Sequence, residues 1–232
     1  MGKTQHQKAD EFQRLHAAPG VFIIPNPWDA GSAKALAGMG FKALATTSAG
    51  LAFSLGKPDG DGSVTRDEAL ANARAIVEAV DLPVAADLEN GYGDRPEDCA
   101  DTIRSAAAVG LVGGSIEDSS GRSGDPIYQL DHAVERIRAA VDAARSLPFH
   151  FMLAARAENF LHGRPDLKDT IRRLQAFQEA GADVLFAPGL RTADDIRAVC
   201  SSVDRPVNAV MGLSGVTLSA RDLEALGVKR IS

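Results

Sequence analysis

Two carboxylates stand where an apolar run of this sequence meets a glycine-rich turn. Asp87 and Glu89 follow the run 84–86 and precede the turn 91–93. In an extended strand, residues two apart point to the same side, so both side chains are expected to project together from the strand end. Carboxylate oxygens in this arrangement suit a divalent cation such as Mg²⁺. The alternative is a strand that ends in two solvated acids, and the rest of the chain has to decide between these interpretations.

Charged side chains follow other predicted strands in the same way. Glu117 comes directly after residues 112–116, and Arg156 comes directly after residues 149–155. Asp87, Glu89 and Glu117 would belong to neighbouring strands and could share one cation, directly or through water. Arg156 could hold a substrate carboxylate through two hydrogen bonds. It could instead form a structural ion pair with one of the acids.

A glycine-rich segment, residues 48–63, follows the second predicted strand. It is expected to be a long loop, and long loops in compact domains are usually functional. At its start, Ser48 with the backbone N–H groups of Ala49 and Gly50 could cradle a second carboxylate or an oxyanion. Together with the acids and Arg156, this segment predicts a site for a small dianionic acid chelated to Mg²⁺.

These residues are positioned by an alternation of strands and helices along the chain. Eight apolar segments are expected to be strands, namely residues 21–24, 43–46, 83–86, 112–116, 149–155, 184–187, 207–210 and 228–231. Helices are expected between them, with Asp29 and Thr65 as N-caps, and Glu68 completes a capping box with Thr65. The alternation predicts one (β/α)₈ (TIM) barrel domain over residues 1–232, with the active site at the carboxyl ends of the strands.

The sequence stops just after the eighth predicted strand. The eighth outer helix is therefore expected to be absent or truncated. A barrel without that helix exposes an apolar flank, which favours a partner subunit that covers it. We accordingly expect a homo-oligomer.

Composition argues against several classes of partner. The 232 residues carry a net charge of −6 without a long basic run, so neither nucleic acid nor an anionic membrane surface is expected to bind. No apolar run reaches the roughly 18 residues of a membrane span, and the polar residues 1–14 do not form a secretory signal. Cys99 and Cys200 have no cysteine or histidine at ligand spacing and are expected to be reduced thiols of a cytoplasmic protein.

Six short motifs stand in order along the chain, namely residues 25–33 (PNPWDAGSA), 47–50 (TSAG), 56–60 (GKPDG), 86–93 (ADLENGYG), 116–118 (IED) and 155–156 (AR). Together they resemble the isocitrate lyase/phosphoenolpyruvate mutase superfamily, in its phosphonomutase-like branch. The resemblance implies a (β/α)₈ barrel, Mg²⁺ or Mn²⁺, and a 2-oxo or 2-hydroxy carboxylate substrate. Members form or cleave C–C or P–C bonds through an enolate or a related intermediate. They commonly swap the eighth helix between subunits of a dimer or tetramer.

The resemblance also implies roles for individual residues. Asp87 would bind the metal directly, Glu89 and Glu117 would hold metal-bound waters, and Asp59 would lie near the metal. The expected substrate contacts are Ser48, Ala49, Gly50 and Arg156, with Trp28 and Asn208 as further candidates. Three of these residues are expected to take part in catalysis, namely Ser48, Asp87 and Arg156.

The loop after Glu117 departs from the superfamily pattern. Isocitrate and methylisocitrate lyases carry a Lys-Lys/Arg-Cys-Gly-His motif there, and phosphoenolpyruvate mutases carry a Lys and an Asn. Residues 119–126 read SSGRSGDP instead, so neither activity carries over. We expect a Mg²⁺-dependent lyase that cleaves a C–C bond of a small 2-oxo acid, as in oxaloacetate decarboxylation. The donor that returns a proton to the enolate is left open among Tyr92, Arg122 and a metal-bound water.

Three other interpretations remain at this point. The chain could be a non-catalytic protein that binds oxo-acids, because the loop residues of the known lyases are missing. It could be an enzyme that acts on the P–C bond of a phosphonate. It could also be a phosphate-binding barrel in which residues 211–215 (MGLSG) form the phosphate loop. In the last case the acids would repel phosphate unless a metal intervened.

Overall fold

Parallel strands form the centre of the molecule. The structure, a computed structural model, describes residues 2–212 and 217–232. The strands are β1 (Phe22–Ile23), β2 (Leu44–Ala45), β3 (Val84–Asp87), β4 (Gly113–Glu117), β5 (Met152–Arg156), β6 (Val184–Phe186), β7 (Val207–Ala209) and β8 (Arg230–Ile231). All pairings are parallel, and the order is β1-β8-β7-β6-β5-β4-β3-β2. Each strand except β1 and β2 thus lies between its neighbours in the chain, and β8 returns to β1, as in a barrel.

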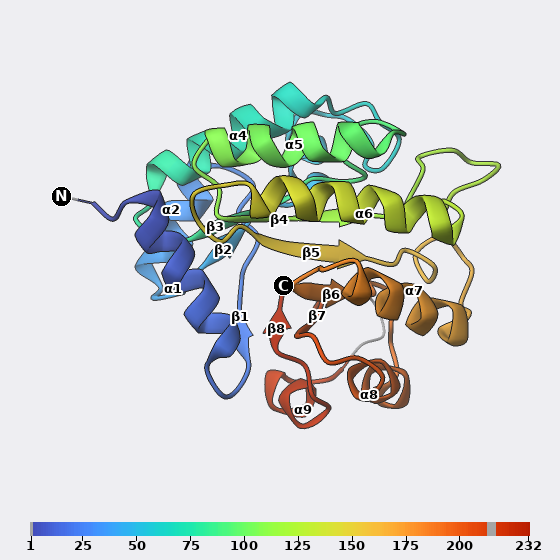
Figure 1. The fold of residues 1–232 in the computed structure, drawn as a ribbon. Helices are drawn as coiled ribbons and strands as arrows, with labels where there is room; N and C mark the ends of the chain where they lie inside the picture. The colour runs from blue at the N-terminus through green and yellow to red at the C-terminus, as the bar shows by residue number, and fades with distance from the viewer. Residues whose placement is uncertain (1, 213–216) are drawn as a thin grey trace.

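Helices separate the strands and cover the outside of the sheet (Figure 1). They are α1 (Gln5–Ala17), α2 (Ala30–Gly38), α3 (Ser48–Ser54), α4 (Arg66–Ala79), α5 (Pro96–Ala108), α6 (Leu130–Arg145), α7 (Leu167–Glu179), α8 (Ala193–Ser201) and α9 (Ala220–Ala225). Within the described residues, no helix follows β8. The predicted (β/α)₈ barrel is confirmed, although most strands are shorter than their apolar segments.

The seam between β1 and β2 is held differently from the rest of the barrel. On one edge, β1 pairs with β8, where Phe22 stands beside Arg230. On the other edge, the N–H of Ala45 donates to the carbonyl of Pro25 at 3.1 Å. The side-chain amide of Asn26 donates to the carbonyl of Ala45 at 3.0 Å. Residues that follow β1 therefore close the barrel, and they bring Asn26 to its carboxyl end.

The amino-terminal end of the barrel is filled by α1. This helix lies at the end where β4 and β5 begin (Figure 1). Its Phe12 is fully buried and belongs to one apolar cluster with Ala85, Met152 and Ala154. Gly113 leaves room for the Phe12 ring, because a Cβ there would lie 2.9 Å from a ring carbon. With this end packed, the carboxyl ends of the strands are the open end of the barrel.

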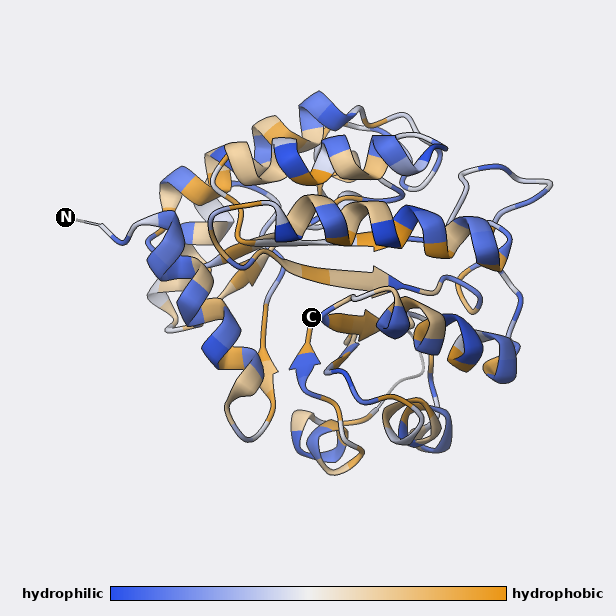
Figure 2. Ribbon diagram, viewed as in Figure 1, coloured by the Kyte–Doolittle hydropathy of each residue, from blue (hydrophilic) through white to orange (hydrophobic). Residues whose placement is uncertain are grey.

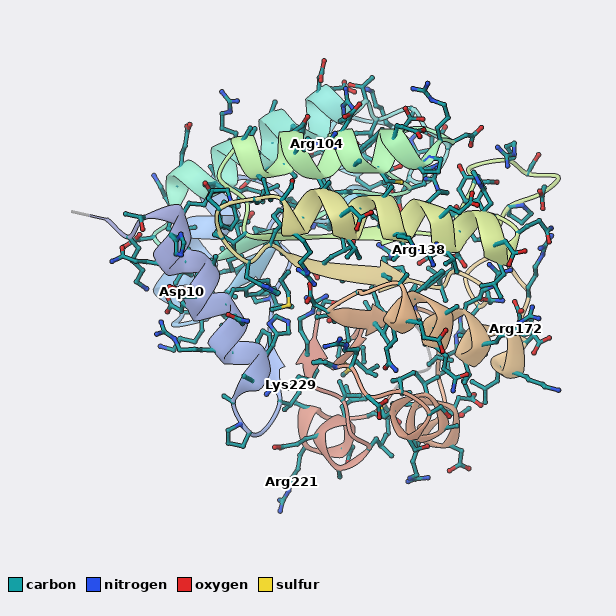
Figure 3. All side chains as sticks on the ribbon, in the orientation of Figure 1. Asp10, Arg104, Arg138, Arg172, Arg221 and Lys229 are labelled. Carbon is teal, nitrogen blue, oxygen red and sulfur yellow. The ribbon has the colours of Figure 1, made fainter. Side chains whose placement is uncertain are left out.

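Hydrophobic residues dominate β5 and β6, whereas α6 and α7 carry both hydrophobic and hydrophilic stripes (Figure 2). This pattern fits helices that bury one face against the sheet. The opposite faces carry charges, and Figure 3 labels the exposed Asp10, Arg104, Arg138, Arg172 and Arg221. In the part of the chain that the structure describes, no helix is long and apolar enough to cross a membrane. Cys99 and Cys200 are free.

The local signals that begin helices behave as the sequence predicts, with one exception. Asp29 caps α2, and Thr65 forms a capping box with Glu68 at the start of α4. The prediction of a loop over residues 48–63 is wrong for its first part, where α3 forms. The Thr47 hydroxyl caps α3, whose apolar residues pack on Val64, so burial outweighs the glycine content of the segment.

Candidate functional site

A cavity of about 200 Å³ lies at the carboxyl ends of the strands. Its walls carry the polar and charged side chains that the barrel turns inward. The polar lining residues are Asn26, Thr46, Thr47, Ser48, Asp59, Asp87, Ser115, Arg156, Asn208, Arg230 and Ser232. The apolar residues around them include Ile24, Leu161 and Phe186. Six of the residues predicted from sequence to bind metal or substrate line this cavity, namely Ser48, Ala49, Asp59, Asp87, Arg156 and Asn208.

Arg156, the last residue of β5, is surrounded by three carboxylates. Its Nη1 lies 3.1 Å from Asp87, its Nη2 lies 3.4 Å from Glu117, and its Nε lies 2.9 Å from Glu158. Burial opposes the charge, but Glu158, Asp87 and Glu117 raise the pKa of Arg156 well above its ordinary value. The ring of Phe186 lies 5.1 Å from the guanidinium carbon. Arg156 therefore forms ion pairs with the acids, as one of the two sequence interpretations predicts, and it also lines the cavity.

Asp87 is held in one orientation at the end of β3. Its Oδ2 accepts the backbone N–H of Ser48 at 3.3 Å, and its Oδ1 accepts the N–H of Glu89 at 3.2 Å. Burial by itself would raise the pKa of Asp87, but Arg156 and the hydrogen bonds from Glu89 and Ser48 hold it below its ordinary value. Asp87 is thus an ionised carboxylate with a fixed direction.

Glu89 does not point where an extended strand would place it. The strand ends at Asp87, and Glu89 takes a φ of +46°, which is rare for a residue with a side chain. Glu89 and Glu117 line a second cavity, of about 620 Å³, rather than the one that Asp87 lines. Burial raises the pKa of Glu89 to about 7, and the charges of Asp87 and Asp59 add to this effect. The extended backbone on which the same-side prediction rests therefore does not reach Glu89, although the two acids remain electrostatically coupled.

A clamp from α6 holds the turn that carries Glu89. The side chain of Arg136 is almost fully buried, and its Nη1 donates to the carbonyl of Gly93 at 2.8 Å. Its Nη2 donates to the carbonyl of Asn90. The ring of Tyr128 lies 4.3 Å from its guanidinium carbon. These contacts offset the strain of two left-handed residues in the same turn, Glu89 and Tyr92.

The four residues of the predicted metal set are divided between the linings of the two cavities. Asp59 and Asp87 line the first cavity, and Glu89 and Glu117 line the second. In residues 2–212 and 217–232, no three histidine, cysteine or acidic side chains form a group that could hold a metal ion together. Direct sharing of one cation by Asp87, Glu89 and Glu117 is therefore not the arrangement found.

The chemistry of these donors nevertheless fits Mg²⁺. Burial raises the pKa values of Asp59 and Glu117, and repulsion from the neighbouring carboxylates raises them further. Arg156 contacts two of these four acids, Asp87 and Glu117. Mg²⁺ typically binds through one or two carboxylates and keeps several waters, so a cage of three protein ligands is not required. Asp87 could supply the direct oxygen, and the other three acids could accept hydrogen bonds from waters.

Of the predicted substrate cradle, Ser48 and Ala49 reach the cavity. The Ser48 hydroxyl lowers the pKa values of Asp59 and Asp87 against the effect of burial. The backbone N–H of Gly50 donates to the Thr47 hydroxyl at 3.2 Å, and Gly50 does not line the cavity. The donors that face the cavity therefore come from the first two residues of α3.

Trp28 supports the cradle from outside. A Cβ on Gly50 would lie 2.5 Å from the Trp28 ring, so this ring packs directly on the glycine. Trp28 is 48% exposed and does not line the cavity. It also contacts Phe53, with the ring centres 6.4 Å apart. The structure thus places Trp28 behind α3 rather than against a bound substrate.

Asn208, in β7, lines the same cavity as Asp87 and Arg156. Its Oδ1 accepts a hydrogen bond from Nε of Arg230 at 2.7 Å, and its Nδ2 donates to the Ser232 hydroxyl at 3.0 Å. Arg230 and Ser232 were not among the residues predicted from sequence. Glu158 was expected at the same end of the barrel, two residues after Arg156, but it was given no role in the site.

The loop after Glu117 contributes little charge to the cavities. Arg122, a candidate proton donor, is paired with Asp94 at 3.0 Å and lines neither cavity. Tyr92, another candidate, lines the second cavity together with Ser119 and Ser120. Burial and the nearby carboxylates raise the pKa of Tyr92 above its ordinary value, so it stays protonated. Residues 213–215 of the predicted phosphate loop lie outside the described residues.

Known proteins resemble this chain along most of its length. The family model described as phosphoenolpyruvate phosphomutase matches residues 12–232. A crystal structure from Burkholderia cenocepacia J2315 is 60% identical, with a TM-score of 0.96 over 98% of this chain and 81% of that one. The 2,3-dimethylmalate lyase of Eubacterium barkeri is 31% identical over 94% of this chain and 77% of its own length. The structure of oxaloacetate acetylhydrolase with its product oxalate is 26% identical, with a TM-score of 0.90 over 99% and 81% of the two chains.

Proposed function

The chain belongs to the phosphoenolpyruvate phosphomutase family, within the isocitrate lyase/phosphoenolpyruvate mutase superfamily, and on that premise we propose that it is a Mg²⁺-dependent carbon–carbon lyase. Its substrate would be a small 2-oxo carboxylic acid. The observation that carries the proposal is the cluster of Arg156 with Asp87, Glu117 and Glu158 at the wall of a small polar cavity. The names of two relatives, a 2,3-dimethylmalate lyase and an oxaloacetate acetylhydrolase, support the same class of substrate.

Arg156 would orient the carboxylate next to the 2-oxo group. Its Nη1 and Nη2 each contact one carboxylate, and because each carries two N–H groups, donors remain for a ligand. The Ser48 hydroxyl and the Ala49 backbone would contact the same end of the substrate. Mg²⁺, held by Asp87 and by waters on Glu89, Glu117 and Asp59, would supply Lewis-acid stabilisation of the negative charge that develops on the 2-oxo oxygen.

Oxaloacetate decarboxylation is the reaction that we propose first. The bond between C3 and C4 breaks, CO₂ leaves, and the electron pair is delocalised onto the 2-oxo group. C3 must then take a proton, which yields pyruvate. Tyr92 is a better placed source than Arg122, because Tyr92 lines a cavity with Glu89 and Glu117 whereas Arg122 is held by Asp94. Solvent would return the proton to the phenol.

A panel of acids tests the proposed function. Loss of oxaloacetate, 2-methylisocitrate, phosphonopyruvate and 2-oxoglutarate is followed with Mg²⁺ and after removal of divalent cations by a chelator. We expect turnover of oxaloacetate with Mg²⁺ only. Turnover of phosphonopyruvate alone would favour an enzyme that acts on the P–C bond. Tight binding of an acid without loss of any of the four would contradict the lyase and favour a binding protein.

We also propose that the protein forms a homo-oligomer. Large apolar side chains are exposed around α3, namely Trp28, Phe53 and Leu55, and the rings of Trp28 and Phe53 contact each other. Exposed apolar side chains that lie close together are typical of interaction surfaces. Size-exclusion chromatography with light scattering measures the mass directly, and a mass of 24.3 kDa, that of one chain, would contradict the proposal.

A further inference from the structure

Two arginines enter the cavity from a single row of the sheet. Arg156 of β5 pairs with Phe186 of β6, Phe186 pairs with Asn208 of β7, and Asn208 pairs with Arg230 of β8. Paired residues of neighbouring parallel strands point to the same face. All four residues do line the cavity. Arg156 and Arg230 therefore stand at the two ends of one inward-facing row, with an aromatic ring and an amide between them.

The surroundings of Arg230 are neutral. The residue is 7% exposed, and its Nε donates to the amide oxygen of Asn208 at 2.7 Å. Its Nη1 lies 3.5 Å from Nε2 of His16, whose Nδ1 is 2.9 Å from the carbonyl of Phe12. Within the part of the chain that the structure describes, Arg230 takes part in no ion pair, and burial alone lowers its pKa to about 10. A buried guanidinium without a carboxylate partner is disfavoured.

One edge of the Arg230 guanidinium faces the cavity. Its Nη2 has no hydrogen-bond partner in residues 2–212 and 217–232, yet it is not among the nitrogen atoms that are sealed from solvent. Ser232 lies beside it on the cavity wall. The Ser232 hydroxyl accepts a hydrogen bond from Asn208 at 3.0 Å, so its own proton is available to a ligand. An anion at this place would meet one charged donor and one neutral donor.

We propose that Arg230 and Ser232 bind a second carboxylate of the substrate, at the end remote from the 2-oxo group. The two arginines would then hold the two ends of one acid, and the site would select dicarboxylic over monocarboxylic acids. Asn208 acts as a positioning residue, because its amide fixes both partners. This inference rests on the proposed function for the position of the 2-oxo end. The cavity of about 200 Å³ limits the acid to a short chain.

Matched pairs of acids test the selection directly. Binding is measured by isothermal titration calorimetry with Mg²⁺ present, for malate against 2-hydroxybutanoate and for 2-oxoglutarate against 2-oxopentanoate. Each pair has one chain length and differs in the second carboxylate. We expect the wild-type protein to bind the diacid of at least one pair about tenfold more tightly, as one charge-assisted contact provides. No preference in either pair, or no binding of any of the four acids, would overturn the proposal.

Substitutions assign the preference to Arg230. Arg230→Met should bring the two affinities of a pair within about twofold, since the charged donor is gone. Arg221→Met, at an exposed position of α9 (Figure 3), is the matched control and should leave the preference unchanged. Circular dichroism and melting temperature establish that each variant is folded. A folded Arg230→Met protein that keeps the preference would contradict the proposal.

A second variant avoids the loss of the arginine. Asn208→Asp places a carboxylate where the amide oxygen now lies 2.7 Å from Nε of Arg230. The arginine then has an internal counter-ion, so the preference for diacids should disappear although Arg230 is present. Retention of the preference in this variant would overturn the proposal even if Arg230→Met does not fold. None of these measurements requires turnover, so an absence of lyase activity would contradict the proposed function alone.

Discussion

Each end of the cavity contains a buried arginine, but the partners of the two arginines differ in charge. On the side of β3, β4 and β5, Arg156 is surrounded by Asp87, Glu117 and Glu158, and acidic charge is in excess. On the side of β7 and β8, Arg230 meets an amide and an imidazole but no carboxylate in the described residues. The first side is suited to a cation and the second to an anion. A short acid that chelates a metal at one end and carries a charge at the other would balance both.

The two sides also differ in how the chain holds them. On the acidic side, the left-handed residues Glu89 and Tyr92 stand in a turn that Arg136 clamps from α6. On the basic side, Arg230 rests against His16 of α1, which plugs the other end of the barrel. The acidic side therefore depends on backbone strain that is offset locally, and the basic side depends on a packed terminal helix. Substitutions on one side should therefore change activity or stability without affecting the other side.

The largest expected effect comes from removal of the arginine on the acidic side. Arg156→Met leaves three carboxylates without their cation and removes the contact to the 2-oxo end of the substrate. We expect kcat/KM for oxaloacetate to fall about a thousandfold, which corresponds to ~4 kcal/mol. Initial rates at saturating Mg²⁺ measure this. Arg172→Met, at an exposed position of α7 (Figure 3), is the control, and a similar loss there would show that the effect is not specific to the site.

A smaller effect is expected from the support behind the acidic side. Gly50→Ala places a methyl group 2.5 Å from the Trp28 ring, so the ring or α3 must move. We expect a cost of about 1–3 kcal/mol in the free energy of unfolding, measured by urea denaturation. Gly38→Ala is the matched control, since nothing lies within 4 Å of its Cβ and alanine favours a helix. If both variants are equally stable, Trp28 does not pack on α3 as described.

The smallest effect concerns acid pH on the basic side. Burial, and then the charge of Arg230, lower the pKa of His16 to about 3 from an ordinary value of 6.5. The hydrogen bond to the Phe12 carbonyl and the charge of Asp183 oppose this shift, and Lys229 adds to it. Between about pH 3 and pH 6.5, His16 therefore binds a proton in the unfolded chain but not in the folded chain. The contribution of neutral His16 to the free energy of unfolding is therefore fully present above pH 6.5 and is lost as the pH falls toward 3.

His16→Gln removes this titration. Between pH 7 and pH 5 the wild-type protein should lose up to about 2 kcal/mol more unfolding free energy than His16→Gln. Urea denaturation at both pH values gives the difference. His6→Gln, at an exposed position of α1, should follow the wild type. Parallel pH dependence of His16→Gln and the wild type would contradict the description of the basic side.

The sequence predicts the architecture better than the site. Alternating apolar segments and local caps, such as Asp29 and Thr65, depend on neighbours in the chain, and they correctly predict the strands and the described helices other than α3. The direction of Glu89 was missed because it depends on a left-handed backbone and on a clamp by Arg136, 46 residues from the carbonyl of Asn90 that it contacts. No local pattern carries that information.

The basic side was missed for a related reason. Arg230 contacts Asn208, 22 residues away, and His16, 214 residues away, so its partners follow from strand order and not from spacing. Its lack of a carboxylate partner is visible only after the barrel is assembled. By contrast, Asp87, Glu117 and Arg156 end the adjacent strands β3, β4 and β5, and this position alone was sufficient to select them.

Magnesium dependence of oxaloacetate loss, compared between the wild type and Asp87→Ala, tests the central claim most directly. Asp87 is the ionised, oriented carboxylate that we assign to the metal. We predict that the wild type consumes oxaloacetate with Mg²⁺ and that the chelator abolishes this activity. Asp87→Ala should have no Mg²⁺-dependent activity, whereas Asp10→Ala, at an exposed position of α1 (Figure 3), should match the wild type. Undiminished Mg²⁺-dependent turnover by Asp87→Ala would contradict the account.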